Sequence, residues 1–394
     1  MRILFTFTGG RGHLDPLIAI ARAAAAAGHT VAFSGQARLM PAVEAEGFAA
    51  FATFPSSGDG APVRTSLLEL SAEREDAVLR DVFAGRLARQ RADGLLALCG
   101  TWQPDLLVCD EVDFGALVAA ERLGLPYATV LVTAAGSFVR ADVVAEPLDA
   151  LRAEHGLDPD PELAMLRRHL VLSPFPPSFR DPSAPLPVTA RSVRMIPCEP
   201  ARAGRTPLVY FTLGTVFNLE SGDLFARVLA GLRELPIELV VSVGDPIDPS
   251  ELGPQPPNVR VERHVDHASL LPRCSAVVSH GGSGTVLAAL AHGLPSVLLP
   301  MGADQPLNAQ RCASLGVARV LDAVRATPAD AGAAVAAVLT DPRYRDAALR
   351  MRDELVRLPG PEHAVDLLRA LALRYPRRVG SSDASPRGWT VRST

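Results

Sequence analysis

The sequence predicts an α/β protein with two Rossmann-like domains, each built around a parallel β-sheet. Its 394 residues exceed the size of one ordinary domain and suit two domains of near-equal size. In both halves, short apolar runs alternate with helical patterns about ten residues long, which is typical of parallel, doubly wound sheets. The alternation stops once, at 197–207, where prolines, a glycine and polar residues predict a linker.

The N-terminal domain is predicted to cover 1–196. It opens on the apolar run "RILFTFT", interpreted as a buried strand, and on a helical pattern that Gly28 ends as a C-cap. Strands are expected at 2–8, 30–35, 106–110 and 126–132, and helices at 14–29 and 114–124. The stretches 54–100 and 137–190 are rich in charge, proline and isolated aromatics, and are predicted to be helices and loops inserted at one end of the sheet.

The second domain is predicted to cover 208–360. Its strands are expected at 208–214, 238–244, 276–280 and 296–300, and its helices at 223–235, 285–292 and 343–357. A further helix at 361–376 is expected to pack back on the N-terminal domain. The remaining stretch, 377–394, is polar and contains Gly, Ser and Pro, so it is predicted to be disordered.

Charge and composition exclude several classes of protein. The net charge is −4 with no basic stripe, so no nucleic-acid partner is expected. No run approaches the ~18 continuous apolar residues of a membrane span, and the first residues do not have the pattern of a secretory signal. We therefore expect a cytoplasmic protein without stable membrane insertion.

The cysteine and lysine contents limit the kinds of catalytic and metal-binding site that the protein can contain. The five cysteines are scattered and odd in number, without metal-type spacing, which favours reduced core cysteines and no metal site. All 39 Lys+Arg residues are arginine, so a Schiff-base lysine and a P-loop lysine are excluded.

The stretch "HGGSGTVLAALAHGLPSVLLPMGADQPLNAQ", 280–310, places small and hydroxyl residues between a strand and a helix. The free N–H groups of such a helix start, together with the helix dipole, favour an anion. A dinucleotide fingerprint would need a third glycine at position 287, which is leucine, although Asp304 lies about where a ribose-binding acid would. NAD binding by an oxidoreductase therefore stays open as an alternative. The neighbouring Asp304 and Gln305, just after a strand end, suit hydrogen bonding to sugar hydroxyls.

This stretch, continued to "RCASLGVARVL", resembles the donor-binding signature of the inverting GT-B glycosyltransferases of family 1, above all the bacterial enzymes that glycosylate natural products. Three further segments resemble the same family: "VYFTLGTVFN", "VRVERHVDHASLLPRCSAVVSHGG" and "RILFTFTGGRGHLDPLIAIARAAAAAGHTVAF". The resemblance implies a GT-B fold, in which two Rossmann-like domains with parallel sheets face a central cleft. It also implies a nucleotide-sugar donor, a TDP-sugar or UDP-sugar, and no cofactor. The acceptor domain would be N-terminal and the donor domain C-terminal.

The resemblance implies the donor-binding residues. The diphosphate would lie against the small-residue turn, Thr215 would add a hydroxyl contact, and Asp304 and Gln305 would hold the sugar. The Gln305 amide could instead cap the helix that Pro306 begins. Many relatives stack the nucleobase on a tryptophan, but this chain has His264 followed by Val265. The implied donor-binding set is Gly12, Thr215, His264, Val265, His280, Gly281, Gly282, Ser283, Gly284, Thr285, Asp304 and Gln305.

His13 is the candidate general base, because it follows the first strand and imidazole has a suitable pKa at neutral pH. By the family pattern it would pair with an aspartate; Asp110 ends the run "DLLVCD", and Glu111 and Asp113 are close rivals. The implied reaction is a single in-line displacement with inversion, in which the acceptor is a small hydrophobic natural product with a hydroxyl group. Candidate acceptor contacts are Phe138, Phe175 and Phe179.

Several alternatives stay open. One is a lipid-linked N-acetylglucosaminyltransferase, which would need an apolar patch ringed by basic residues. Others are a nucleotide-sugar-modifying enzyme of the same fold, a catalytically inactive helper protein, and the NAD oxidoreductase. The oligomeric state is also open, with a homodimer as one option.

Overall fold

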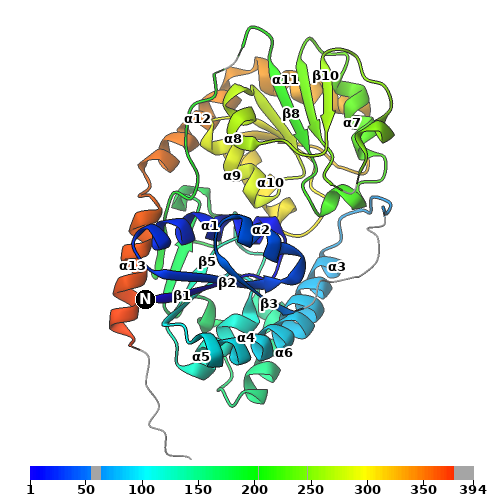
Figure 1. Cartoon of the computed structure of the whole chain (residues 1–394). Coiled ribbons are helices and arrows are strands. Elements are labelled where there is room, and N and C mark those ends of the chain that lie inside the picture. Colours follow the sequence, from blue (N-terminus) through cyan, green and yellow to red (C-terminus); the bar gives the residue numbers. More distant parts are fainter. Residues whose placement is uncertain (55–63, 203, 246, 377–394) are drawn as a thin grey trace, which may run out of the picture.

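The computed structural model, shown in Figure 1, describes residues 1–54, 64–202, 204–245 and 247–376. Within these ranges the chain forms two wholly parallel sheets in two lobes, one of seven strands and one of six. The predicted α/β class is confirmed. The tail predicted to be disordered, 377–394, lies outside the described residues.

The N-terminal sheet has the strand order β3-β2-β1-β4-β5-β6-β7. Its strands are β1 Arg2–Thr6, β2 Thr30–Gln36, β3 Ala49–Phe54, β4 Leu106–Asp110, β5 Tyr127–Val130, β6 Leu170–Ser173 and β7 Ala190–Ser192. The strand order reverses between β1 and β4, and ligands of open α/β sheets bind beyond the carboxyl ends of the strands at such a point. The loops after β1 and β4 are therefore the place to look for an active site.

Helices cover the two faces of this sheet. They are α1 Arg11–Ala26, α2 Met40–Ala45, α3 Ala72–Ala77, a π-helical segment η2 Val78–Leu87, α4 Ala88–Trp102, α5 Phe114–Leu123 and α6 Ala141–Glu154. The first helix begins at Arg11 instead of the expected position 14, so His13 lies in its first turn. Its apolar face, which includes Leu14 and Leu17, is fully buried.

The C-terminal sheet has the order β10-β9-β8-β11-β12-β13. Its strands are β8 Leu208–Thr212, β9 Glu238–Ser242, β10 Val259–Glu262, β11 Ala276–Ser279, β12 Ser296–Leu298 and β13 Ala318–Val320. Its main helices are α7 Leu224–Leu232, α9 Ser283–Ala291, α10 Gln305–Ser314, α11 Pro328–Thr340 and α12 Pro342–Arg357. Here the order reverses between β8 and β11, which places the loops 213–216 and 280–282 at the second switch point.

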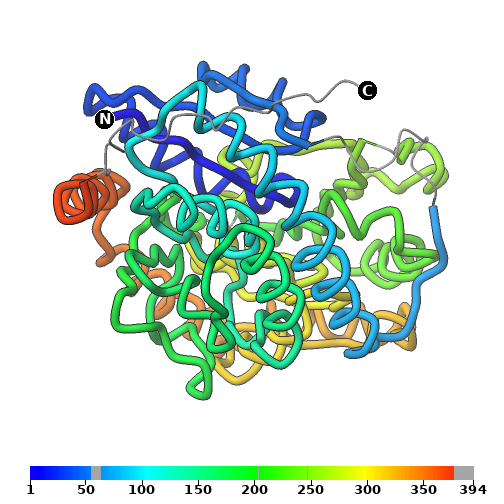
Figure 2. The backbone as a smooth tube through the Cα atoms, turned by 90° about the horizontal axis from the view of Figure 1, so that it is seen from below, coloured from blue at the N-terminus to red at the C-terminus, as the bar shows by residue number. Residues whose placement is uncertain are grey.

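The last helix, α13 Pro361–Arg374, leaves the C-terminal lobe and lies along the N-terminal one, as the red segment shows in Figure 1 and Figure 2. Its side chains Ala364, Val365 and Leu368 are buried in the same cluster as Leu14 and Leu17 of α1. A second contact joins the lobes at α9 and α10, where the N–H groups of Ala134 and Ala135 donate to the side chains of Ser283 and Asn308. None of the helices in the described ranges combines the length and apolarity needed to cross a membrane.

The inserted stretches are only partly as expected. In the described part of the stretch 54–100, residues 72–100 are helical, and the strand β3, which was not predicted, ends at Phe54. The strand β6 lies inside 137–190, and β7 begins at residue 190. The elements β10, β13 and α11 were also not predicted. The edge strand β10 carries charges on alternate positions, and β7 and β13 each contain an arginine at an exposed position, so none of the three forms a continuous apolar run.

Candidate active site

His13 and Asp110 meet at the first switch point. Nδ1 of His13 lies 3.2 Å from Oδ2 of Asp110, which comes from the end of β4. The imidazole is 25% exposed, whereas the carboxylate is fully buried. The ring is thus held from behind by an acid and keeps its other nitrogen available to a substrate. This is the arrangement of a general base whose tautomer is fixed by a carboxylate.

Asp110 is built as a buried acceptor. Its Oδ2 accepts the backbone N–H of Thr8 at 2.8 Å, and its Oδ1 accepts that of Val112 at 2.8 Å. Burial opposes ionisation, but His13 and these two N–H donors outweigh it and lower the pKa of Asp110. For His13, burial alone would lower the pKa, because it disfavours the charged imidazolium. The nearby charge of Asp110 outweighs this effect, so the pKa of His13 is raised.

Gly9 provides the floor under the His13 ring. A Cβ on Gly9 would lie 2.1 Å from Cδ2 of His13 and 2.3 Å from Nε2. The Gly9 carbonyl accepts a hydrogen bond from the side chain of Gln36 at 2.5 Å, so the backbone is fixed from the other side. The close approach requires glycine at this position.

We expect Gly9→Ala to displace the imidazole and lower kcat by about tenfold or more, because misplacing a catalytic group by an ångström is costly. The matched control is Gly10→Ala, whose added methyl would meet its nearest neighbour at an ordinary 3.7 Å. Steady-state transfer measured for both variants checks this. Equal activity of the two would show that the ring does not depend on Gly9.

The two rival acids have other partners. Asp113 forms an ion pair with Arg91 at 2.7 Å, with both side chains fully buried, and it caps α5. Glu111 accepts the N–H groups of Val132 and Thr133 and the Thr133 hydroxyl, while burial raises its pKa. Neither contacts His13, so Asp110 is the partner that the structure supplies.

The small-residue turn occupies the second switch point. Gly281 has φ of +85°, and α9 begins at Ser283 without a side-chain cap and without an acidic residue in its first turn. The first hydrogen bond back to the turn comes from the N–H of Val286 to the Gly282 carbonyl at 3.0 Å. The N–H groups of Ser283, Gly284 and Thr285 therefore have no acceptor within the helix, an arrangement that favours a bound anion.

His280 lies beneath this turn, only 8% exposed. Burial lowers its pKa to about 4, so the ring is neutral at physiological pH. Its ring packs so closely on Gly214 and Gly282 that a Cβ on either would lie less than 3 Å from it (2.7 and 2.6 Å). His280 thus joins the turn after β11 to the loop after β8 that carries Thr215.

Asp304 lies at the start of α10, beside the turn. Its Oδ2 accepts the Ser283 hydroxyl at 2.6 Å and the Asn308 side-chain amide at 2.7 Å. Burial raises the pKa of Asp304 despite these bonds, and His13 is close enough to act on it electrostatically. The His13–Asp110 pair of one lobe and Asp304 of the other are therefore close enough to influence each other electrostatically. Asn308 was not predicted, although it stands four residues after Asp304 on one helix face.

Gln305 differs from its predicted role as a sugar ligand. Its Oε1 accepts the N–H groups of Met301 and Gly302 at 2.8 and 3.3 Å, and the side chain is 2% exposed. An amide committed to its own turn and buried to this degree has no oxygen to offer a sugar. It shapes the turn that carries Asp304.

The remaining predicted donor residues are exposed or half-buried. Gly12 is exposed in the first turn of α1, and Thr215 is exposed between Gly214 and Val216. Val216 lies close to Gly10 of the other lobe: a Cβ added to Gly10 would be 3.7 Å from Cγ2 of Val216. His264 is 56% exposed and pairs with Asp245 at 2.5 Å, and Val265 packs at the edge of a core cluster.

The three phenylalanines do not line one pocket. Phe175 and Phe179 are buried in a cluster with Val286, Leu287 and Leu290 of α9, so they join the two lobes. Phe138 packs against the core under the N-terminal sheet. The proposed acceptor role of Phe175 and Phe179 is therefore corrected to interdomain packing: both are closed off from solvent, at 3% and 0% exposure.

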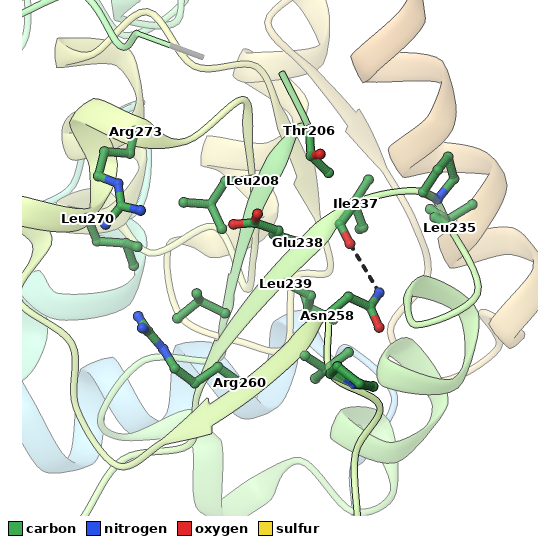
Figure 3. Close-up of a pocket in the computed structure, with 14 residues that line it drawn as sticks. Thr206, Leu208, Leu235, Ile237, Glu238, Leu239, Asn258, Arg260, Leu270 and Arg273 are labelled. Carbon is green, nitrogen blue, oxygen red and sulfur yellow. Dashed lines mark hydrogen bonds between the residues drawn. The ribbon is translucent and has the colours of Figure 1, made fainter. Parts of the chain in front are cut away.

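A groove of about 740 Å³, shown in Figure 3, lies elsewhere. It is lined by Leu208, Glu238 and Val259, which begin β8, β9 and β10, and by Arg260 and Arg273. These are the amino ends of the strands, opposite the small-residue turn, so the groove is not part of the candidate active site. Among the described residues, no group of three or more His, Cys, Asp or Glu side chains is placed to hold a metal ion.

Solved structures share this architecture. The spinosyn rhamnosyltransferase SpnG, solved with thymidine diphosphate, superposes with a TM-score of 0.74 at 26% identity, over 94% of this chain and 100% of that one. The calicheamicin glycosyltransferase CalG4 gives a TM-score of 0.76 at 23% identity, over 95% and 99%. The fold is that of a GT-B glycosyltransferase, as predicted.

Sequence relatives identify the family. The model described as "Erythromycin biosynthesis protein CIII-like, C-terminal domain" matches residues 226–371. The chain is 31% identical to 4'-demethylrebeccamycin synthase of Lentzea aerocolonigenes, over 94% of this chain and 99% of that enzyme. It is 29% identical to tylactone mycaminosyltransferase of Streptomyces fradiae, over 98% and 95%. The chain belongs to the glycosyltransferases of antibiotic and other natural-product biosynthesis.

Proposed function

We propose that the protein is an inverting glycosyltransferase that moves a sugar from a TDP-sugar to a hydroxyl of a small hydrophobic natural product. One observation carries the proposal: the His13–Asp110 pair of one lobe faces the Asp304 and α9 start of the other. The relatives named for tylactone and 10-deoxymethynolide support a natural-product acceptor. The neighbour solved with thymidine diphosphate supports TDP ahead of UDP.

The residues take the following roles. Nε2 of His13 accepts the proton of the acceptor hydroxyl while Nδ1–H donates to Asp110. The acceptor oxygen forms a bond to the anomeric carbon as the bond from that carbon to the diphosphate oxygen breaks, and its electron pair leaves with TDP. Attack from the face opposite the leaving group inverts the anomeric centre.

The donor is proposed to lie across the C-terminal turn. The N–H groups of Ser283, Gly284 and Thr285 would stabilise the charge that develops on the diphosphate. His280, held neutral, would contribute a hydrogen bond without a charge, and the chain would need no metal. Asp304 would hold the sugar hydroxyls, and Thr215, His264 and Val265 would complete the nucleotide site.

We also propose a cytoplasmic location. All five cysteines of the chain are free thiols, and four of them are buried. This is the pattern of proteins from a reducing compartment.

The donor half of the proposal predicts a ligand-dependent gain in thermal stability. Because a ligand that binds only the native state stabilises it, TDP at about 100 times its Kd should add about 2.7 kcal/mol and raise Tm. The measurement is a melting panel with TDP, UDP, GDP and NADH. A rise with NADH alone would contradict the proposal and favour an oxidoreductase.

A further inference from the structure

The turn 301–304, which presents Asp304, has an unusual distribution of hydrogen bonds. The N–H groups of Met301 and Gly302 both donate to the side chain of Gln305, the residue that follows the turn. The next N–H, that of Ala303, donates to Oε2 of Glu75 at 2.8 Å. Glu75 belongs to α3 of the N-terminal lobe and is 228 positions away in sequence. One lobe thus completes the hydrogen bonding of a turn in the other.

The turn is held in a conformation that needs support. Ala303 has φ of +51°, in the left-handed region that residues other than glycine rarely adopt. Gly302 lies between the two lobes: an added Cβ would be 3.0 Å from Oε1 of Glu75 and 2.9 Å from Phe217 of the C-terminal lobe. Such conformations persist where the surroundings over-determine them, and here Glu75 is part of those surroundings.

The opposite side of Asp304 is also held from the N-terminal lobe. The N–H of Ala134 donates to the Ser283 hydroxyl at 2.8 Å, and the N–H of Ala135 donates to Oδ1 of Asn308 at 3.0 Å. Ser283 and Asn308 are the two residues that donate to Asp304. Asp304 is therefore fixed through Ser283 and Asn308 on one side and through its turn on the other.

Glu75 is the side chain best placed to be tested. Its carboxylate is 20% exposed and has one nearby cation, Arg74, at 3.8 Å. The bond to Ala303 is a charge-assisted one, a class about twice as strong as neutral hydrogen bonds. The backbone amides of residues 134 and 135, in contrast, cannot be removed by a side-chain substitution.

We propose that Glu75 is a positioning residue: from the acceptor lobe it holds the turn that presents Asp304 to the donor sugar, so that sugar binding depends on contact between the lobes. This rests on the proposed function, in which Asp304 binds the sugar. Glu75 itself is not assigned a contact with substrate.

The test compares Glu75→Ala and Glu75→Gln with Glu73→Ala. Glu73 is an exposed acid of the same helix turn, and its carboxylate accepts a hydrogen bond from the Ser71 hydroxyl at the start of that helix. Hydrogen–deuterium exchange of the segment 299–306 is measured first, without ligand. We expect the Ala303 amide to exchange about tenfold faster in Glu75→Ala, less in Glu75→Gln, and unchanged in the control.

Binding of TDP and of TDP-glucose is then measured by calorimetry. In Glu75→Ala, affinity for TDP-glucose should fall by about tenfold relative to TDP, because the sugar site is disturbed and the diphosphate site is not. Unchanged exchange in Glu75→Ala would overturn the proposal. Faster exchange with unchanged binding of both nucleotides would also overturn it, since the contact would then be structural only.

These outcomes remain distinct from a failure of the proposed function. If the unsubstituted protein bound neither nucleotide, the donor assignment would be wrong, and with it the positioning role. If Asp304→Ala lost affinity for TDP-glucose but Glu75→Ala did not, the function would stand and the role of Glu75 would fall.

Discussion

Replacing His13 by alanine is expected to lower kcat by about 10²- to 10⁴-fold, the range that a positioned general base contributes. The acceptor hydroxyl then has no base within the site, because Asp110 is fully buried behind the missing ring. TDP affinity should stay unchanged, since the proposed diphosphate site belongs to the other lobe. The measurement is TDP release from a TDP-sugar in the presence of an aglycone acceptor, together with calorimetric binding of TDP.

The fold should survive this substitution. The His13 side chain is partly exposed, but its loss takes one hydrogen-bond partner from the buried Asp110, so Tm should fall only slightly. A variant that melts normally, binds TDP and still transfers sugar at the full rate would remove His13 from the mechanism.

Asp110→Asn is expected to lower kcat by about 10²- to 10⁴-fold as well, because the amide keeps the shape but cannot stabilise the imidazolium or fix the tautomer. The amide oxygen can accept only one of the N–H groups of Thr8 and Val112, but both belong to the N-terminal lobe, so the loss should appear in kcat more than in donor affinity. Steady-state kinetics on the purified variant test this. Glu111→Gln is not a neutral control, because Glu111 holds the loop at Val132 and Thr133.

The same variant should move the pH profile. His13 acts as a base only when neutral, and Asp110 raises its pKa above 6.5, so activity should be lost as pH falls through that raised value. Removing the charge of Asp110 leaves burial as the dominant influence on the pKa of His13, which lowers it. The acid limb of kcat against pH should therefore shift to lower pH in Asp110→Asn. An unshifted limb would mean that another group titrates.

The part of the fold that the sequence predicted is the buried part. Strands such as β1, β4, β8 and β11 are covered on both faces, so each appears in the sequence as a short, nearly continuous apolar run. The strands β7 and β13 were not predicted, because an arginine and exposed positions interrupt their three residues, whereas β12 has the same length but is buried throughout. The edge strand β10 was hidden by its half-exposed, charged positions.

Part of the candidate site could likewise be predicted from the sequence, and part could not. His13, Asp110 and the small-residue turn follow strand ends, and parallel strands bring their carboxyl ends together, so local sequence was enough to predict their neighbourhood. Glu75 could not be predicted, because its contact with Ala303 exists only through the arrangement of the lobes. The same arrangement buries Phe175 and Phe179, which the sequence offered as candidate acceptor contacts or as local packing.

The most direct test of the central claim is a structure of the protein with bound TDP. We expect the diphosphate within hydrogen-bond distance of the N–H groups at 283–285. Asp304 and His13 should lie on either side of the space that the sugar of a TDP-sugar would occupy. A diphosphate bound away from the start of α9, for example in the groove at the amino ends of β8 and β9, would contradict it.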